Sequence, residues 1–268
     1  MTSEPNVLKP SERLDDLLTH DLKIIQSPEV FSFSMDAVLL ARFAGLPMHG
    51  RVLDLCTGNG AIPLLMSTRT KAKIEGVEIQ PRLADMAVRS VALNDLTSRI
   101  TIHEGDIRDF HLQAGYGVYD AITVNPPYMP VTRSDVNHNP HYAAARHEIH
   151  CTLEDVAAAS ARLVKSGGKV SMVHRSTRLA EIFAALQRVK LEPKRVRFVH
   201  PYANAEANML LIEAVRDGRP EVRVMPPLIV YNEEKQYVPE LLEIYYGRSG
   251  AAGKEEKANA NPDQLSDD

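Results

Sequence analysis

The stretch DAITVNPPYMP, residues 120–130, begins as an apolar run and ends in prolines around one tyrosine. Its first half predicts a buried strand, and Asn125 follows directly. Pro126 and Pro127 fix their own φ and hold each preceding residue in extended geometry, so the turn is rigid. The side-chain oxygen of Asn125 and the carbonyl oxygen of Pro126 can then converge on one amino group, which has two N–H donors. Tyr128 can stack on a flat ring, so the turn predicts a site for a planar amine.

An amine attached to a ring or a carbonyl group is a weak nucleophile, because its lone pair is delocalised. Two fixed acceptors favour a pyramidal nitrogen and stabilise the positive charge that develops there when it attacks a methyl donor. In-line positioning against the methyl group supplies much of the remaining rate. The turn therefore suits methyl transfer to a planar amino nitrogen, a reaction for which we expect neither a metal nor a strong base.

Such a turn needs a rigid support, and the surrounding sequence alternates predicted strands with predicted helices. Strands are expected at or within residues 52–55, 73–80, 99–110, 119–128, 169–175, 194–201 and 208–216. Helices are expected at 81–96, 152–168 and 176–189, directly after the glycines at 58 and 60, and after a strand end and turn within 31–45. The alternation predicts an α/β fold with a mostly parallel, seven-stranded sheet covered by helices on both faces. The last two strands are joined by a loop too short for a helical crossover, which predicts an antiparallel edge strand.

The ends of the predicted elements give further expectations. Thr152 and Asp155 have the spacing of a capping box at a helix start, and Gly167 with Gly168 is expected to close that helix. A strand-rich extension is expected over 222–247. Residues 1–247 then form one domain with short extensions at both ends. The tail 248–268 is rich in Gly, Ala, Asn and charge, and we expect it to be disordered.

Ligands in such sheets bind beyond the carboxyl ends of the strands, and acids follow three of the strands at that edge. A carboxylate at the second strand can accept from both ribose hydroxyls, and one after the third can accept from an adenine amino group. Glycines after the first strand let a ligand lie against the backbone. Any one acid alone is more simply a solvated loop carboxylate or a helix cap, but three at one edge favour a nucleoside site. The residues at this edge are Asp54, Thr57, Gly58, Gly60, Glu78, Ile79, Asp106 and Ile107.

The series Asp54-x-x-x-Gly58-x-Gly60, Glu78, Asp106 and NPPY resembles the class I methyltransferases that use S-adenosylmethionine and modify planar amino nitrogens. The resemblance covers about residues 22–214 and implies a Rossmann-like fold. FSFSMDAVLLARFA, NPPYMP and PPLIVYNEEKQYVPE are similar to a narrower group, the bacterial tRNA1(Val)-type adenine-N6 methyltransferases of the methyltransferase small domain type. That resemblance implies that a loop with Ser34 and Asp36 closes over the cofactor, and that Asn125 also reaches it.

The resemblance further implies a tRNA substrate, methylated on an adenine N6 beside the anticodon. NPPY also resembles enzymes that methylate protein glutamine, guanine N2 of ribosomal RNA, and adenine in DNA, so these acceptors stay open. The glutamine enzymes usually carry a separate N-terminal helical domain, whereas about 20 residues precede the first element expected here. A binding protein without activity on the same fold is a third hypothesis, and the intact acids and NPPY count against it.

The net charge of −4 argues against binding nucleic acid through bulk charge, but residues 162–197 hold ten Lys or Arg and two acids. A predicted strand carries Lys194, Arg195 and Arg197, which are expected to form a basic stripe that contacts phosphate. Arg146, outside that stripe, is also expected to contact phosphate. Four histidines in 138–150 are expected in a flexible loop that faces the substrate rather than in a metal site. Two cysteines, no leader peptide and no membrane span predict a cytoplasmic protein, and no obligate protein partner is evident.

Overall fold

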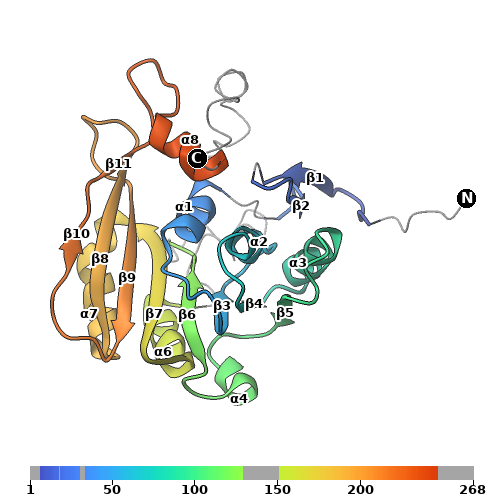
Figure 1. Cartoon of the computed structure of the whole chain (residues 1–268), viewed down its shortest axis with the longest axis horizontal. Helices are drawn as coiled ribbons and strands as arrows, with labels where there is room; N and C mark the ends of the chain where they lie inside the picture. Colours follow the sequence, from blue (N-terminus) through green and yellow to red (C-terminus); the bar gives the residue numbers. More distant parts are fainter. Residues whose placement is uncertain (1–6, 18, 31–33, 129–150, 247–268) are drawn as a thin grey trace, which may run out of the picture.

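A computed structural model describes residues 7–17, 19–30, 34–128 and 151–246 of the chain (Figure 1). The predictions for Arg146, for the histidines of 138–150 and for the tail 248–268 lie outside these residues. In the part of the chain that the structure describes, no helix has the length and apolar character needed to span a membrane.

A mostly parallel sheet forms the centre of the molecule and contains the seven predicted strands. Two short strands extend it beyond the prediction, because β10 and β11 pair in parallel with the outer edge of β8. The strands are β3 (Arg51–Leu55), β4 (Lys73–Glu78), β5 (Ile100–Glu104), β6 (Tyr119–Val124), β7 (Val164–Arg175), β8 (Leu191–His200), β9 (Met209–Arg216), β10 (Arg223–Val224) and β11 (Leu228–Ile229). Their order is β10-β8-β9-β7-β6-β3-β4-β5, with β11 also on β8.

The chain passes from β3 outward to β4 and β5, and β6 then returns to the other side of β3. The strand order therefore reverses between β3 and β6, which is where open α/β sheets bind ligands. At the far side, β9 is antiparallel to both neighbours, β7 and β8, as the short connection predicted. It is not an edge strand, because the β8–β9 hairpin folds back so that β9 pairs with β7 and β8 lies outside it.

Helices cover both faces of the sheet, as predicted (Figure 1). Alternate strand residues point to opposite faces, so Val52 joins one apolar cluster while Leu53 joins the other. The first cluster includes residues of α1, α2, α3 and α8, and the second includes residues of α4, α6 and α7. The helices are α1 (Met35–Phe43), α2 (Ala61–Ser67), α3 (Pro81–Leu93), α4 (Phe110–Ala114), α6 (Leu153–Leu163), α7 (Leu179–Arg188) and α8 (Pro239–Tyr246).

The start of α6 was predicted correctly, and its end was not. Thr152 accepts from the backbone of Asp155, whose side chain accepts from the Thr152 backbone, so the capping box is formed. The helix ends at Leu163, and Gly167 and Gly168 lie inside β7 rather than at a helix terminus. The pairing of β7 with β6 shifts register over this stretch, so the glycines belong to an irregular strand start and not to a cap.

The two ends of the described chain also differ from the expectations. An unpredicted antiparallel hairpin, β1 (Arg13–Asp16) and β2 (Lys23–Gln26), lies beside α3. The extension over 222–247 was expected to be strand-rich, yet after β10 and β11 it finishes in the helix α8. Pro239 suits the first turn of that helix, and Leu241, Leu242 and Tyr245 form its buried side.

Candidate active site

The predicted amine-binding turn lies at the carboxyl end of β6, next to the reversal in strand order. Pro126 and Pro127 are buried, while Asn125 and Tyr128 are half-buried and face the ligand edge of the sheet. β6 lies directly beside β3, so Thr123 of β6 and Asp54 of β3 are register partners. The turn and the predicted cofactor loop therefore share one edge.

Asp36 lies against this turn, a contact made across 92 residues of sequence. Its carboxylate accepts from the hydroxyls of Ser34 and Tyr128 and from the backbone N–H of Ala37, at 3.1 Å for the last. The Tyr128 hydroxyl also lies within hydrogen-bond distance of the Asn125 side-chain oxygen, and a hydroxyl has only one proton to donate. Burial raises the pKa of Asp36, and the hydrogen bonds from Ser34 and the backbone oppose that rise. Asp36 thus positions both side chains of the turn.

Three residues that were not predicted for the site hold Tyr128 from the end of β7. The His174 ring contacts the Tyr128 ring edge-on at 5.4 Å between centroids, and the Arg175 guanidinium lies 5.6 Å from the same ring centre. Arg178 donates to the Tyr128 carbonyl at 3.4 Å. The sequence HRSTR ends a predicted strand at the ligand edge, and that position was the available signal.

His174 is 1% exposed, and burial together with the charge of Arg178 lowers its pKa to about 4. Its Nδ1 accepts the backbone N–H of Arg175 at 2.9 Å, so the neutral ring carries its proton on Nε2. Among the described residues this Nε2 has no hydrogen-bond partner. An uncharged ring therefore lies beside Tyr128 at neutral pH.

Asp54, the first predicted cofactor acid, is completely buried. Its two oxygens accept from the hydroxyls of Thr57 and Thr123, both at 2.6 Å. Burial raises the pKa of Asp54 to about 7, against the lowering effect of the two hydroxyls, and the nearby charge of Glu78 adds to the rise. In this structure Asp54 fixes the loop that follows β3 rather than presenting a free carboxylate to a ligand.

The loop after β3 turns through two glycines in left-handed geometry. Gly58 has φ +58°, and a Cβ placed on it would meet no atom within 4 Å, so open space lies over this backbone. Gly60 has φ +89°, and its Cβ would lie 3.1 Å from that of Ala87, so this glycine also lets the loop pack on α3. The loop presents bare backbone to the ligand edge.

Glu78 ends β4 beside this loop and is 5% exposed. Its oxygens accept the backbone N–H groups of Gly58 and Gln80, each at 2.9 Å. Burial raises the pKa of Glu78, and these backbone hydrogen bonds oppose the rise. An ionised carboxylate has about four acceptor positions, so two remain for a pair of ligand hydroxyls.

The remaining predicted cofactor residues, Ile79, Asp106 and Ile107, differ in exposure and in their partners. Ile79 is 36% exposed and offers apolar surface at the edge, whereas Ile107 is 5% exposed and packs in the second apolar cluster. Asp106 follows β5 and pairs with Arg108, whose Nε lies 2.9 Å from the carboxylate. Asp106 would have to share its oxygens with Arg108 when it accepts from a ligand.

The predicted basic stripe on β8 is largely neutralised by internal partners. Arg195 donates to both oxygens of Glu213, at 3.0 and 2.9 Å, and to the Phe43 carbonyl. Arg197 pairs with Glu240 at 2.7 Å, and Lys194 donates to the Arg219 carbonyl. The cations do lie along β8 as predicted, but the Arg195 guanidinium binds Glu213 of β9 and the carbonyl at the end of α1, so it stabilises the fold.

The chain is similar to known proteins over about two thirds of its length. Residues 21–192 match the family model described as methyltransferase small domain. A Porphyromonas gingivalis protein named tRNA1(Val) (adenine(37)-N6)-methyltransferase is 30% identical over 185 residues, which are 66% of this chain and 72% of that protein. The Aeromonas salmonicida protein of the same name is 31% identical over 179 residues, covering 66% and 73%.

Among solved structures, a predicted O-methyltransferase from Agrobacterium tumefaciens superposes with a TM-score of 0.64 at 25% identity. The alignment covers 80% of this chain and 96% of that one. The Rossmann-like class I fold predicted from the sequence is therefore confirmed, and the chain belongs to the methyltransferase small domain family.

Proposed function

We propose that this chain transfers a methyl group from S-adenosylmethionine to the exocyclic N6 amine of an adenine in tRNA, beside the anticodon. The observation that carries the proposal is the half-buried Asn125 at the end of β6. The bare loop at Gly58 follows the neighbouring strand β3, and Glu78 ends the next strand, β4. The names of the curated relatives support the acceptor. A cytoplasmic location and a single catalytic domain over residues 1–247 belong to the same proposal.

When bound, S-adenosylmethionine supplies an electrophilic methyl group on a positively charged sulfur. Glu78 would accept from the ribose hydroxyls, the loop at Gly58 would lie under the cofactor, and Ile79 would pack on its adenine. Other residues would line that site or support the residues that contact the cofactor. They are Ser34, Asp36, Asp54, Thr57, Gly60, Asp106 and Ile107. These assignments fit an open backbone next to a buried carboxylate with two unused acceptor positions.

At the acceptor, the side-chain oxygen of Asn125 and the carbonyl of Pro126 would accept the two N–H donors of the amine. The Tyr128 hydroxyl lies against the same Asn125 oxygen, so it would turn to Asp36 alone when the amine binds. Asp36 can receive it, because it already lies within hydrogen-bond distance. The Tyr128 ring, held by His174 and Arg175, would then stack on the base.

An amine fits these acceptors better than a hydroxyl does, which favours N-methylation over the O-methylation named for the Agrobacterium tumefaciens protein. An amino group donates two protons and a hydroxyl one, so a hydroxyl would leave one half-buried acceptor without a donor. An unsatisfied polar group of this kind costs about 1–3 kcal/mol.

The test is to incubate the protein with labelled S-adenosylmethionine and tRNA from a strain that lacks the modification, and then to digest the RNA to nucleosides. Label is expected in N6-methyladenosine. Purified ribosomal RNA and total protein are offered in parallel, because guanine N2 and protein glutamine are the competing acceptors. Label that appears in guanine or in protein and not in adenosine would overturn the proposed acceptor.

A further inference from the structure

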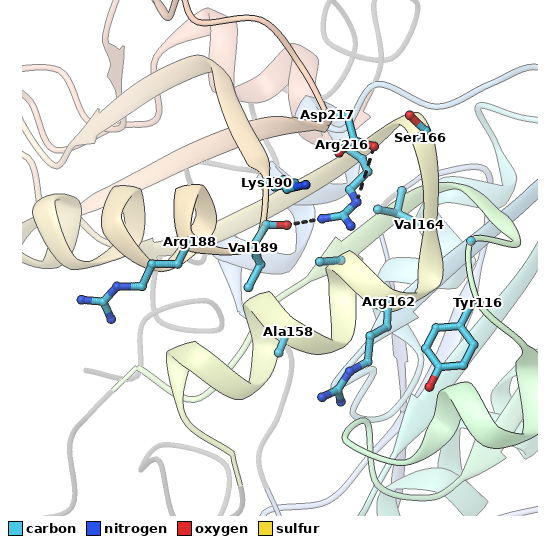
Figure 2. A pocket seen from close by; sticks show the side chains of 12 residues that line it. Tyr116, Ala158, Arg162, Val164, Ser166, Arg188, Val189, Lys190, Arg216 and Asp217 are labelled. Atoms are coloured by element: carbon cyan, nitrogen blue, oxygen red, sulfur yellow. Dashed lines mark hydrogen bonds and ion pairs between the residues drawn. The ribbon is translucent and has the colours of Figure 1, made fainter.

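A groove of about 630 Å³ lies at the opposite end of the sheet from Asn125 (Figure 2). It is lined by α6, the start of β7, the junction of α7 with β8, and the end of β9. The parallel strands begin at this end, and the antiparallel β9 finishes here. β6 runs between the groove and the catalytic turn, and its six residues span about 20 Å, so the two sites lie on separate parts of the surface.

The lining of the groove carries four cations and one acid. Figure 2 shows that the cations come from three parts of the fold: Arg162 from α6, Arg188 and Lys190 from the junction of α7 with β8, and Arg216 from the end of β9. Asp217 is the acid, and its carboxylate lies 3.8 Å from Arg216, which also donates to the Val189 carbonyl.

Three of the four cations have no acidic partner within the described residues and are available to a bound molecule. Arg162 donates to the Arg108 carbonyl at 3.3 Å, which leaves its charge without an acid. Arg188 and Lys190 are exposed, and within the described part of the chain neither makes an ion pair. The groove therefore keeps a net positive charge on a chain whose net charge is −4.

In the basic segment 162–197, some cations pair with acids and others do not. Arg195 and Lys169 face Glu213, Arg197 pairs with Glu240, and Lys165 pairs with Asp120. Those cations hold the sheet together. Of the other cations in the segment, Arg162, Arg188 and Lys190 lie at the groove. Arg175 and Arg178 lie beside Tyr128, and Lys194 donates to the Arg219 carbonyl.

We infer that the groove binds backbone phosphates of the RNA substrate, at a part of the RNA distant from the methylated base. The inference rests on the proposed function. Cations from three parts of the fold around an open hollow suit phosphates spaced along a chain, whereas one small anion would need donors that converge on a point. An RNA that fills the catalytic turn and also reaches the groove must extend over at least the length of β6, about 20 Å, which a folded RNA does.

The test compares tRNA binding by the wild-type chain and by the double variant Arg188→Glu/Lys190→Glu, each over a range of salt concentrations. Removing two phosphate contacts is expected to raise the Kd for tRNA on the order of 10-fold and to lower the slope of log Kd against log salt by about 2. The kcat at saturating tRNA and the Kd for S-adenosylmethionine are expected to stay at wild-type values, because neither residue lies near the catalytic turn.

The matched control is Lys71→Glu/Lys73→Glu. It changes the net charge equally at two exposed cations before and at the start of β4, across the sheet from the groove, and is expected to leave the Kd and the slope unchanged. Arg188→Gln/Lys190→Gln, a milder change, is measured as well and should show a smaller shift in the same direction.

Equal tRNA affinity and equal salt slope in wild type and groove variants would overturn the inference, as would an equal loss in the control. Binding is measured apart from methylation, so the two proposals fail separately. Label in protein or guanine would contradict the assignment of adenine as the acceptor. An unchanged Kd for tRNA in the groove variants would contradict only the proposal that the groove binds RNA.

Discussion

At the scale of single residues, the chemistry depends on where acceptors are fixed rather than on a strong base. Asn125 is held by the two buried prolines after it and contacted by the Tyr128 hydroxyl, which Asp36 also binds. A fixed acceptor needs no reorganisation when positive charge develops on the attacking nitrogen. Asp36 is therefore expected to matter to the rate through the position that it gives Tyr128 and, through Tyr128, Asn125.

Asn125→Ala is expected to lower turnover by about 10²-fold or more, by analogy with loss of one preorganised polar group, while cofactor affinity stays nearly intact. Single-turnover methylation of tRNA and calorimetry with S-adenosylmethionine measure the two effects. Tyr128→Phe is the control, since it keeps the stacking ring and removes a hydroxyl that must leave Asn125 in any case. Wild-type turnover in Asn125→Ala would show that the amine is held elsewhere.

Glu78→Ala is expected to weaken S-adenosylmethionine binding by roughly 1–3 kcal/mol, the range for lost hydrogen bonds to a charged group. Calorimetry gives the Kd directly. Glu78→Gln keeps an acceptor for the backbone N–H of Gly58 or Gln80, so it separates loss of the ligand contact from loosening of the loop. Unchanged affinity in Glu78→Ala would remove this residue from the cofactor site.

At the scale of elements, the structure assigns the most prominent cation of β8 to internal support. Glu213 of β9 is 3% exposed and accepts from Arg195, from the backbone N–H of Gly45 and, at 3.4 Å, from Ser171. The guanidinium of Arg195 also lies 4.6 Å from the centre of the Phe43 ring. This cluster joins β7, β8, β9 and the end of α1.

Arg195→Met is expected to lower the free energy of unfolding by about 2–4 kcal/mol, because it leaves the buried carboxylate of Glu213 without its main partner. Urea denaturation measures the change. Lys194→Met, one residue away, is the control and should change stability by less than about 0.5 kcal/mol, because among the described residues the Lys194 side chain donates only to the Arg219 carbonyl. The double variant Arg195→Met/Glu213→Met should recover part of the loss; an intact stability in Arg195→Met alone would contradict the assignment.

At the scale of the whole molecule, two buried groups give stability opposite dependences on pH. Burial lowers the pKa of His174 to about 4, so between pH 6.5 and 4 the unfolded chain binds a proton that the folded chain does not. The contribution of His174 to the free energy of unfolding therefore falls as the pH falls through this range. Burial raises the pKa of Asp54 to about 7, so its contribution falls as the pH rises from about 4 to 7.

Because these two effects oppose each other, a single pH profile of the wild type hides them, and a variant is needed. His174→Asn keeps an acceptor for the Arg175 N–H and removes the titration. The stability difference between wild type and variant is expected to shrink by roughly 1–2 kcal/mol from pH 7 to pH 5. Urea denaturation at the two pH values measures it, and a constant difference would mean that His174 titrates alike in the folded and unfolded chains.

The sequence by itself determined the local elements and the residues at the strand ends. The seven strands β3 to β9, the capping box of α6, the glycines after β3, and the placing of Glu78 and Asn125 at one edge all follow from periodicity, from turn chemistry and from the rule for the carboxyl ends of parallel strands. These features depend on residues close in sequence, so the sequence alone is enough to predict them. The family followed from the same residues.

Only the tertiary structure decided which side chains meet. Asp36 contacts Tyr128, which is 92 residues away in sequence. His174 and Arg175 contact Tyr128 from another strand, β7. Arg195 pairs with Glu213 on the other strand of the β8–β9 hairpin. An alternating pattern shows which face a cation lies on, but a buried acid on a neighbouring strand decides whether its charge is free. Arg195 and Arg197 pair with Glu213 and Glu240, whereas Arg188 and Lys190 at the groove make no ion pair within the described residues.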